Sequence, residues 1–268
     1  MTRIAILSQS GEPQLEKLAE ELSLPLIEAE RASKHDFVLL CDNEHLELRE
    51  GCALDQPGVW VDFSQVDLRT GSGNLSKRQP LAKAMGPRAH TLLDATAGLG
   101  QDAFLLACIG FQVTAVERSP VLSALLHDAL ERAEKNAEIA RVLGGRLHLL
   151  HGDSLELLRN PDREPDVVYL DPMFPPRRKK SALAKKPIRM VRSLVGDSQE
   201  DSELLTLALE CARYRVVVKR HKGSEPLPGK APSLHYAGKL VRYDVYETHR
   251  PAPKIDPGFE SIPGEHHI

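Results

Sequence analysis

The fold of this chain is indicated most clearly by the stretch Leu92-Leu93-Asp94-Ala95-Thr96-Ala97-Gly98-Leu99-Gly100-Gln101-Asp102. An apolar run ends in the carboxylate of Asp94, two glycines follow, and a helical pattern begins at Gln101. A strand, a glycine-rich turn and a helix in this order bring backbone N–H groups close to a bound ligand. The dinucleotide fingerprint has a third glycine three residues after Gly100, where this chain has Ala103. Because the loose form of the fingerprint allows alanine there, spacing alone leaves a nicotinamide enzyme open.

A second strand pattern, Phe111–Val116, ends in the acidic residue Glu117. In a βαβ unit, an acidic side chain at this strand end lies over the ligand crevice and can accept hydrogen bonds from both hydroxyls of a ribose. Strand ends are often acidic, so Glu117 could also be an ordinary surface residue. Together with the preceding carboxylate and two glycines, it favours a ribose-containing ligand. Ser119 and Pro120 then predict the N-cap and the first residue of a helix that runs to about Ile139.

Composition and charge describe a globular protein without an overall bias toward nucleic acid. A length of 268 residues allows one large domain or a medium domain plus a small one, and a hydrophobic share of 41% fits a real core. The net charge is −3, so any basic surface must be local. The four cysteines lie far apart, which argues against a metal site and for a reduced compartment. Without a signal-peptide pattern or a membrane-spanning run, we expect a soluble cytoplasmic protein with no membrane partner.

The chain divides into four parts by its patterns. Residues 1–66 combine short strand signals, one of them at Val59–Phe63, with a helical pattern at Glu12–Leu22. They predict a small N-terminal α/β domain without a catalytic constellation. Residues 67–80 are polar, glycine-rich and basic, as in a linker. Residues 81–248 carry the ligand-binding patterns, and the proline-rich residues 249–268 predict a disordered tail.

A third strand pattern, Arg146–Leu150, leads to Asp153 and Ser154. The carboxylate of Asp153 at this strand end could accept a hydrogen bond from the exocyclic amino group of an adenine. It could equally cap the helix that begins at Ser154. The two roles are compatible, so the sequence leaves both open.

The fourth strand pattern, Asp166–Leu170, runs into Asp171-Pro172-Met173-Phe174-Pro175. This follows the scheme Asp/Asn-Pro-Pro-aromatic of amino-group methyltransferases, with Met173 in place of the second proline. The carboxylate of Asp171 and the carbonyl of Pro172 can accept from an exocyclic amine, and Phe174 offers a face for stacking an extruded base. An isolated Asp-Pro is usually a turn, but after three matching ligand elements a methyl-transfer site is favoured. Since a sulfonium methyl is already activated, alignment worth up to roughly 7–11 kcal/mol can suffice without a metal.

A basic segment, Arg177–Arg192, follows the fourth-strand motif directly. Eight of its sixteen residues are basic and none is acidic. Solvated charged faces normally mix signs. An unmixed basic segment in a chain of net charge −3 therefore indicates a phosphate-rich substrate.

These motifs together closely resemble those of bacterial small-subunit ribosomal RNA guanine-N2 methyltransferases, the RsmJ family. The resemblance rests on Asp94–Phe104, Glu117–Pro120, Tyr169–Pro175, Lys179–Leu183 and Val216–Arg220, and it covers most of the chain from about Ala82 to Tyr246. It implies an α/β fold of the class I (Rossmann-like) methyltransferase type, with a seven-stranded, mostly parallel sheet that binds S-adenosyl-L-methionine (SAM). It also implies methylation of the exocyclic N2 of one guanine in small-subunit (16S) ribosomal RNA, either naked or in the small ribosomal subunit.

The resemblance and the motifs assign candidate residues to three roles. By position, the resemblance implies cofactor contacts at Gln101, Asp102, Glu117, Arg118, Asp153, Ser154 and Asp171, and the glycine-rich turn adds Asp94, Gly98 and Gly100. The catalytic candidates are Asp171, Pro172 and Phe174. The expected RNA contacts are Arg177, Arg178, Lys179, Lys180, Lys185, Lys186, Lys219 and Arg220.

Two alternative functions are compatible with parts of this pattern. A related transferase could act on a glutamine side chain or on DNA, but the basic segment and the absence of asparagine at Asp171 argue against it. A non-catalytic RNA-binding module could keep a degenerate cofactor fold. The intact Glu117, Asp171 and Phe174 argue against that second alternative.

Overall fold

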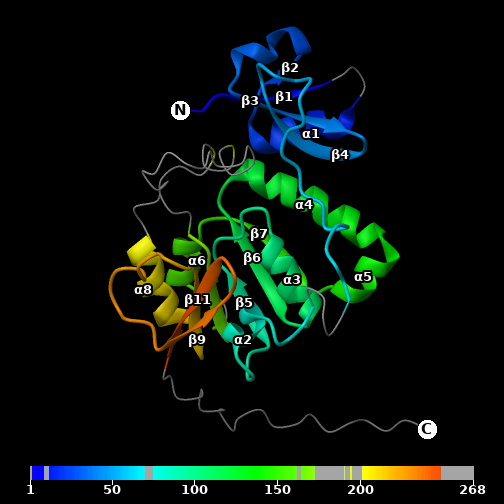
Figure 1. Ribbon diagram of the computed structural model, residues 1–268. Helices are drawn as coiled ribbons and strands as arrows, with labels where there is room; N and C mark the ends of the chain where they lie inside the picture. The colour runs from blue at the N-terminus through cyan, green and yellow to red at the C-terminus, as the bar shows by residue number, and fades with distance from the viewer. Residues whose placement is uncertain are drawn as a thin grey trace, which may run out of the picture.

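The computed structural model describes residues 2–8, 12–69, 75–161, 164–172, 190, 194 and 201–248. They build two sheets, one of four strands near the N-terminus and one of seven strands (Figure 1). In this part of the chain, none of the helices combines the length and the apolar character needed to cross a bilayer.

The N-terminal sheet has the strand order β2-β1-β3-β4. Its elements are β1 (Ile4–Leu7), α1 (Pro13–Leu22), β2 (Leu26–Ile27), the 3₁₀ helix η1 (Ala29–Lys34), β3 (Phe37–Asp42) and β4 (His45–Glu50). Strand β1 pairs in parallel with β2 and β3, whereas β4 returns antiparallel to β3. These residues therefore form the small α/β unit that the sequence predicts.

The strand predicted at Val59–Phe63 is wrong as a regular strand. Only Val59 pairs, in an isolated antiparallel bridge to Leu48 of β4. The alternating apolar residues Val59, Val61 and Phe63 are all buried. Val61 and Phe63 take no part in strand pairing, and their side chains pack into the core instead. The ring of Phe63 stacks on that of Phe104, with ring centroids 4.1 Å apart.

The seven-stranded sheet has the order β10-β11-β9-β8-β5-β6-β7. Its strands are β5 (Thr91–Asp94), β6 (Gln112–Glu117), β7 (Leu147–His151), β8 (Val167–Leu170), β9 (Arg215–His221), β10 (Leu234–Ala237) and β11 (Val241–Glu247). Neighbours pair in parallel except around β11, which is antiparallel to both β9 and β10. The predicted seven-stranded, mostly parallel sheet is confirmed. The chain order reverses at β5, between β6 and β8, and ligands bind at such a switch point beside the carboxyl ends of the strands.

Helices cover both faces of this sheet. They are α2 (Pro80–Met85), α3 (Gln101–Ile109), α4 (Pro120–Lys135), α5 (Ala137–Leu143), α6 (Ser154–Arg159) and α8 (Asp201–Cys211). Adjacent strand residues point to opposite faces: Leu92 packs in the core with α2 to α5, and Leu93 packs with α6 and α8. Figure 1 shows these two groups of helices on either side of the sheet.

The single helix predicted from Pro120 to about Ile139 is wrong at its end. Helix α4 stops at Lys135, and Asn136 is extended, with φ −85° and ψ 113°. The Asn136 Oδ1 atom accepts hydrogen bonds from the N–H groups of Glu138 at 3.1 Å and Ile139 at 3.2 Å, so it caps a second helix. The predicted start is confirmed, because Ser119 Oγ accepts from the N–H of Leu122 at 3.4 Å.

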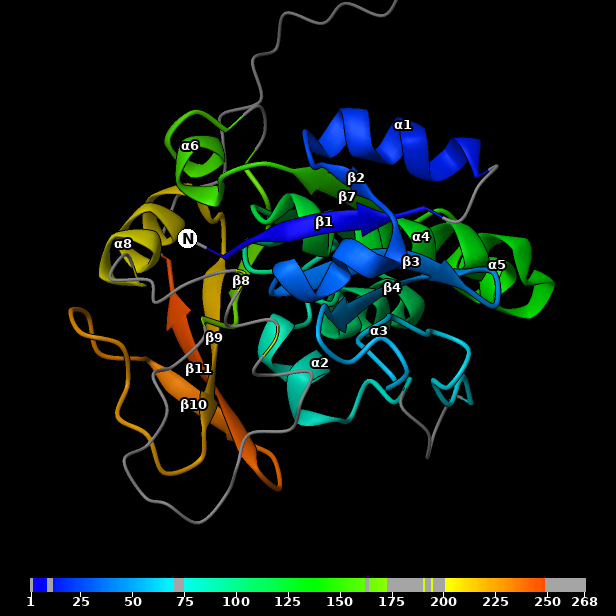
Figure 2. The same cartoon turned by 90° about the horizontal axis from the view of Figure 1, so that it is seen from above.

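The two sheets share one continuous hydrophobic core. Residues of the N-terminal sheet such as Leu48 belong to the same buried cluster as Leu122 of α4. Figure 2 shows the N-terminal sheet lying over α4, the helix that β4 contacts. A hydrogen bond also joins α4 to the segment after β4: the Nη2 atom of Arg132 donates to the carbonyl oxygen of Val61 at 2.6 Å.

Candidate active site

The loop between β5 and α3 needs glycine at two positions. Gly98 has φ +56° and Gly100 has φ +70°, the left-handed region that favours glycine. A side chain at Gly100 would also meet α4, because its Cβ would lie 2.4 Å from Leu126 Cδ1. The turn therefore brings its backbone close to the neighbouring helix and turns the N–H of Gly98 toward β6.

Glu117 ends β6 beside this loop and is only 5% exposed. Its Oε2 atom accepts from the N–H of Gly98 at 2.8 Å, and its Oε1 atom accepts from the N–H of Ser119 at 2.7 Å. Burial raises the pKa of Glu117, and the two backbone N–H groups oppose that rise. Each carboxylate oxygen keeps a further lone pair for a donor on a ligand.

Two residues that follow β7, Asp153 and Ser154, make hydrogen bonds that position α6. Asp153 Oδ1 accepts from the N–H of Leu155 at 2.8 Å, so its capping of α6 is confirmed. An adenine contact by the same carboxylate stays a prediction. The buried hydroxyl of Ser154 donates to the carbonyl oxygen of Ala95 at 2.6 Å and so ties α6 to the loop that follows β5.

Three acids and a lysine meet where β5, β8, β9 and α3 come together. Lys219 Nζ donates to Asp102 Oδ2 at 2.7 Å and to Asp171 Oδ2 at 2.9 Å. The hydroxyl of Tyr169 donates to the same Oδ2 atom of Asp102 at 2.6 Å. We call Asp94, Asp102, Asp171, Tyr169 and Lys219 the carboxylate–lysine cluster.

Asp94 is the most deeply buried acid of the cluster, at 2% exposure. Its Oδ1 atom accepts from the N–H of Thr96 at 3.0 Å, and Thr96 Oγ1 accepts in turn from the N–H of Asp171 at 2.6 Å. Burial above all raises the pKa of Asp94 to about 8, and the neighbouring carboxylates of Asp102 and Asp171 add to the rise. Burial therefore favours the protonated form of Asp94, whose bond to the N–H of Thr96 holds the loop.

Asp171 is the most exposed acid of the cluster. Its side chain is 38% exposed, compared with 24% for Lys219. Burial raises the pKa of Asp171, the Lys219 ammonium lowers it, and the Asp102 carboxylate raises it again. Pro172 follows directly and is buried. The carboxylate of Asp171 is thus held by Lys219 of β9, and its backbone N–H by Thr96 in the loop after β5.

The remaining predicted site residues fall into two groups. Gln101 and Arg118 are exposed, at the start of α3 and just after β6. Phe174 and the expected RNA contacts Arg177, Arg178, Lys179, Lys180, Lys185 and Lys186 lie outside the described residues.

Lys219 and Arg220, also predicted as RNA contacts, lie within β9. The ammonium of Lys219 is bonded to two carboxylates of the cluster. Arg220 is 7% exposed, and its Nε atom donates to the carbonyl oxygen of Glu225 at 2.9 Å. Both side chains therefore serve contacts within the protein.

Sequence reasoning missed two polar members of the site, Tyr169 and Thr96. A signal for Tyr169 was present, since it is a polar side chain in the otherwise aliphatic strand Val167–Leu170. It also stands two residues before Asp171, and such residues point to the same side of a strand. Thr96 gave no signal, because its partner Asp171 is far away in sequence.

Comparison with known proteins decides the family. A family model described as "Putative SAM-dependent methyltransferase" matches residues 17–248. A protein of Thioalkalivibrio sulfidiphilus named ribosomal RNA small subunit methyltransferase J is 45% identical over 256 residues, which cover 92% of this chain and 98% of that protein. The chain belongs to this family of SAM-dependent methyltransferases. A protein of the same name from Pseudomonas savastanoi pv. phaseolicola is 40% identical over 260 residues, which cover 94% of this chain and 93% of that protein.

A solved structure agrees with the family. The crystal structure of a SAM-dependent methyltransferase from Neisseria gonorrhoeae is 31% identical, with a TM-score of 0.68. The match covers 96% of this chain and 100% of that one. The protein is thus a SAM-dependent methyltransferase, and the nicotinamide enzyme left open by the glycine spacing is set aside.

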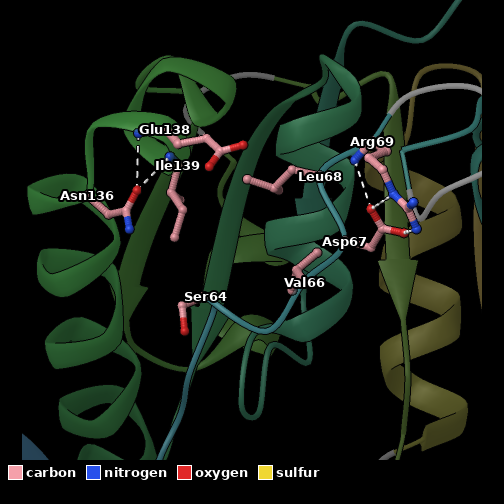
Figure 3. A pocket seen from close by; sticks show the side chains of 8 residues that line it. All are labelled: Ser64, Val66, Asp67, Leu68, Arg69, Asn136, Glu138 and Ile139. Carbon is pink, nitrogen blue, oxygen red and sulfur yellow. Dashed lines mark hydrogen bonds and ion pairs between the residues drawn. The ribbon is translucent and has the colours of Figure 1, made fainter.

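One cavity of this methyltransferase lies away from the candidate site. Its volume is about 310 Å³, and it is lined by Ser64, Val66, Asp67, Leu68, Arg69, Asn136, Glu138 and Ile139. Figure 3 shows these side chains on the segment 64–69 and at the start of α5. Among the described residues, none of the predicted site residues lines this cavity.

Proposed function

We propose that this methyltransferase transfers the methyl group of SAM to the exocyclic N2 of a guanine in small-subunit ribosomal RNA. The relatives at 40% and 45% identity are named for methylation of this RNA. The observation that carries the proposal is the position of Asp171 at the end of β8, fixed through Thr96 and Lys219 beside the glycine loop. This is the place at which an acceptor for a base amine is needed, next to the strand ends where the cofactor binds.

For the cofactor, we assign the ribose to Glu117 and the turn at Gly98 and Gly100. The carboxylate of Glu117 is already held by two N–H groups, so it would not have to reorganise when ribose hydroxyls donate to it. Asp153 has its second oxygen available for an adenine amino group after capping α6. SAM supplies a methyl group on a sulfonium, which needs alignment more than activation.

For the base, we assign the acceptors to the Asp171 carboxylate and the Pro172 carbonyl. Both accept from the exocyclic amine and so aim its lone pair at the methyl group. As the nitrogen gains positive charge, the ionised carboxylate stabilises it. The stacking face expected from Phe174 rests on the sequence motif.

For the RNA backbone, we retain the basic segment Arg177–Arg192 as the contact surface. Its unmixed charge supports binding to phosphates. Lys219 and Arg220 are better assigned to the protein's own contacts, because the first is bonded to two carboxylates and the second is buried.

The direct test is methyl transfer to RNA. Purified protein is incubated with SAM carrying a labelled methyl group and with small-subunit RNA, free or in small subunits, isolated from a strain that lacks this enzyme. Digestion to nucleosides and mass spectrometry should find the label in N2-methylguanosine at one position. Label in another nucleoside, or no transfer to either RNA form, would contradict the proposal.

The cofactor assignment predicts that replacing Glu117 by alanine lowers the affinity for SAM. A charge-assisted hydrogen bond contributes about 1.5–3 kcal/mol, so SAM should bind about ten- to a hundredfold more weakly. Isothermal calorimetry measures this, with Glu134→Ala on the exposed side of α4 as the matched control. A thermal melt of each variant checks that the loop stays folded. Unchanged affinity in a folded Glu117→Ala protein removes Glu117 from the ribose site.

A further inference from the structure

We propose that Lys219 is a positioning residue for methyl transfer, which keeps the carboxylate of Asp171 ionised and fixed in place. The inference rests on the proposed function, in which Asp171 accepts from the amine of the base. It gives Lys219 a role inside the site in place of the RNA contact that the sequence suggested.

The sheet topology brings the two side chains together. Strands β8 and β9 are parallel neighbours, with Leu170 opposite Val218. The residues that follow this pair are Asp171 and Lys219, so the ammonium and the carboxylate emerge side by side. The bond from Nζ to Asp171 Oδ2 is 2.9 Å long. Within the described part of the chain, Asp171 Oδ1 has no hydrogen-bond partner and is the oxygen left for a substrate amine.

A second anchor fixes Lys219 itself. Its Nζ atom also donates to Asp102 Oδ2 at 2.7 Å, and Tyr169 donates to that same oxygen at 2.6 Å. Asp102 is therefore held by two donors from two strands. Lys219 is clamped between this fixed carboxylate and Asp171, so the position of the ammonium does not depend on bound substrate.

The charges around Asp171 make this one cation important. The acids that face it are Asp94 of β5, whose protonated form is favoured by burial, and Asp102 of α3. The phenols of Tyr169 and Tyr243 stay neutral, because burial raises the pKa of Tyr169 and raises that of Tyr243 to about 12. Lys219 is the cation that acts on Asp171 among the described residues, and it balances two carboxylates.

Removal of the ammonium would leave two like charges close together. In such a pair one carboxyl takes up a proton at a higher pH than it otherwise would. If Asp171 takes it, the site loses the negative charge that stabilises the developing cation on nitrogen. Lys219 thus acts on the reaction through Asp171 and has no contact of its own with the base.

The kinetic test is the pH dependence of turnover in Lys219→Met, Lys219→Arg and the control Lys222→Met. Lys222 is exposed just after β9, so its replacement removes one charge nearby without entering the cluster. The acidic limb of turnover should move up by about 1–3 pH units in Lys219→Met. Activity should then recover as the pH rises, while Lys219→Arg and Lys222→Met keep the original profile. A loss that is the same at every pH, or no loss, overturns the proposal.

A second measurement does not need the RNA substrate. The carboxyl carbon of Asp171 is titrated by ¹³C NMR in the full-length protein and assigned by its absence in Asp171→Asn. Its pKa should be higher in Lys219→Met than in the parent, and an equal pKa overturns the proposal. If Lys219→Met does not fold, Lys219→Gln takes its place in both measurements. If the parent protein methylates no RNA, the proposed function fails, while this titration still decides whether Lys219 keeps Asp171 ionised.

Discussion

Replacing Asp171 by alanine is expected to lower the turnover of methyl transfer by about 10²–10³-fold, the usual effect of removing one preorganised group that faces developing charge. The substitution removes the acceptor for the base amine and the negative charge together. The backbone should stay in place, because the bond from the Asp171 N–H to Thr96 Oγ1 does not involve the side chain. Single-turnover assays at saturating SAM measure the effect on the chemical step.

Asp171→Asn separates the two contributions of this side chain. Asparagine keeps a carbonyl oxygen of the same shape but carries no charge. If the charge on Asp171 stabilises the developing cation, the asparagine variant should be nearly as slow as the alanine variant. If only the acceptor oxygen matters, its turnover should stay close to that of the parent protein. Turnover at the parent level in Asp171→Ala, with RNA and SAM still bound, would rule out the assigned role.

The seven-stranded sheet was implied by the family resemblance, and its central strands also carry local signals of their own. Apolar runs such as Leu92–Leu93 and Val167–Leu170 end in polar residues, and glycine or proline follows. Since the carboxyl ends of parallel strands share one edge, the acids found there could be grouped before the structure was known. Asp94, Glu117, Asp153 and Asp171 all lie at strand ends of this kind.

The errors arose where a local pattern has two structural solutions. The apolar positions of α4 continue in period into α5, so only the capping bonds of Asn136 reveal the break. The alternation at Val59–Phe63 is typical of a strand, yet in the structure it packs a connecting segment onto α3. In both cases side-chain contacts within the folded protein override the periodicity.

The role of Lys219 could not be predicted, because it depends on neighbours that are distant in sequence. In the sequence it begins the basic group Lys219-Arg220-His221-Lys222 and suggests a surface for phosphates. Only the strand order places β9 next to β8, and only the turn of the glycine loop places α3 beside both. The two partners of Lys219 are far from it in sequence: Asp171 is 48 residues away and Asp102 is 117 residues away.

The stacked pair of Phe63 and Phe104 is expected to hold the N-terminal sheet on the methyltransferase fold. Both rings are buried and nearly parallel, with an interplanar angle of 2°. Phe63→Ala should lower the free energy of unfolding by about 3–5 kcal/mol, since it leaves a cavity between the segment 59–63 and α3. Urea denaturation followed by fluorescence and circular dichroism measures this loss. Leu26→Ala is the control, because Leu26 of β2 is 44% exposed and its truncation leaves no internal cavity.

The shape of the unfolding curve tests how the two sheets depend on each other. Because one hydrophobic core contains residues of both, Phe63→Ala should unfold in a single transition at lower urea. A double-mutant cycle with Phe104→Ala should give a coupling of about 0.5–1.5 kcal/mol for the two rings. Two results would contradict this expectation: a decrease in the free energy of unfolding below about 1 kcal/mol, or a separate transition at low urea that leaves SAM binding intact. Either would show that the N-terminal sheet is stable without its packing on α3 and α4. A single transition that abolishes SAM binding would instead make the sheet part of the platform on which α3 and the glycine loop are held.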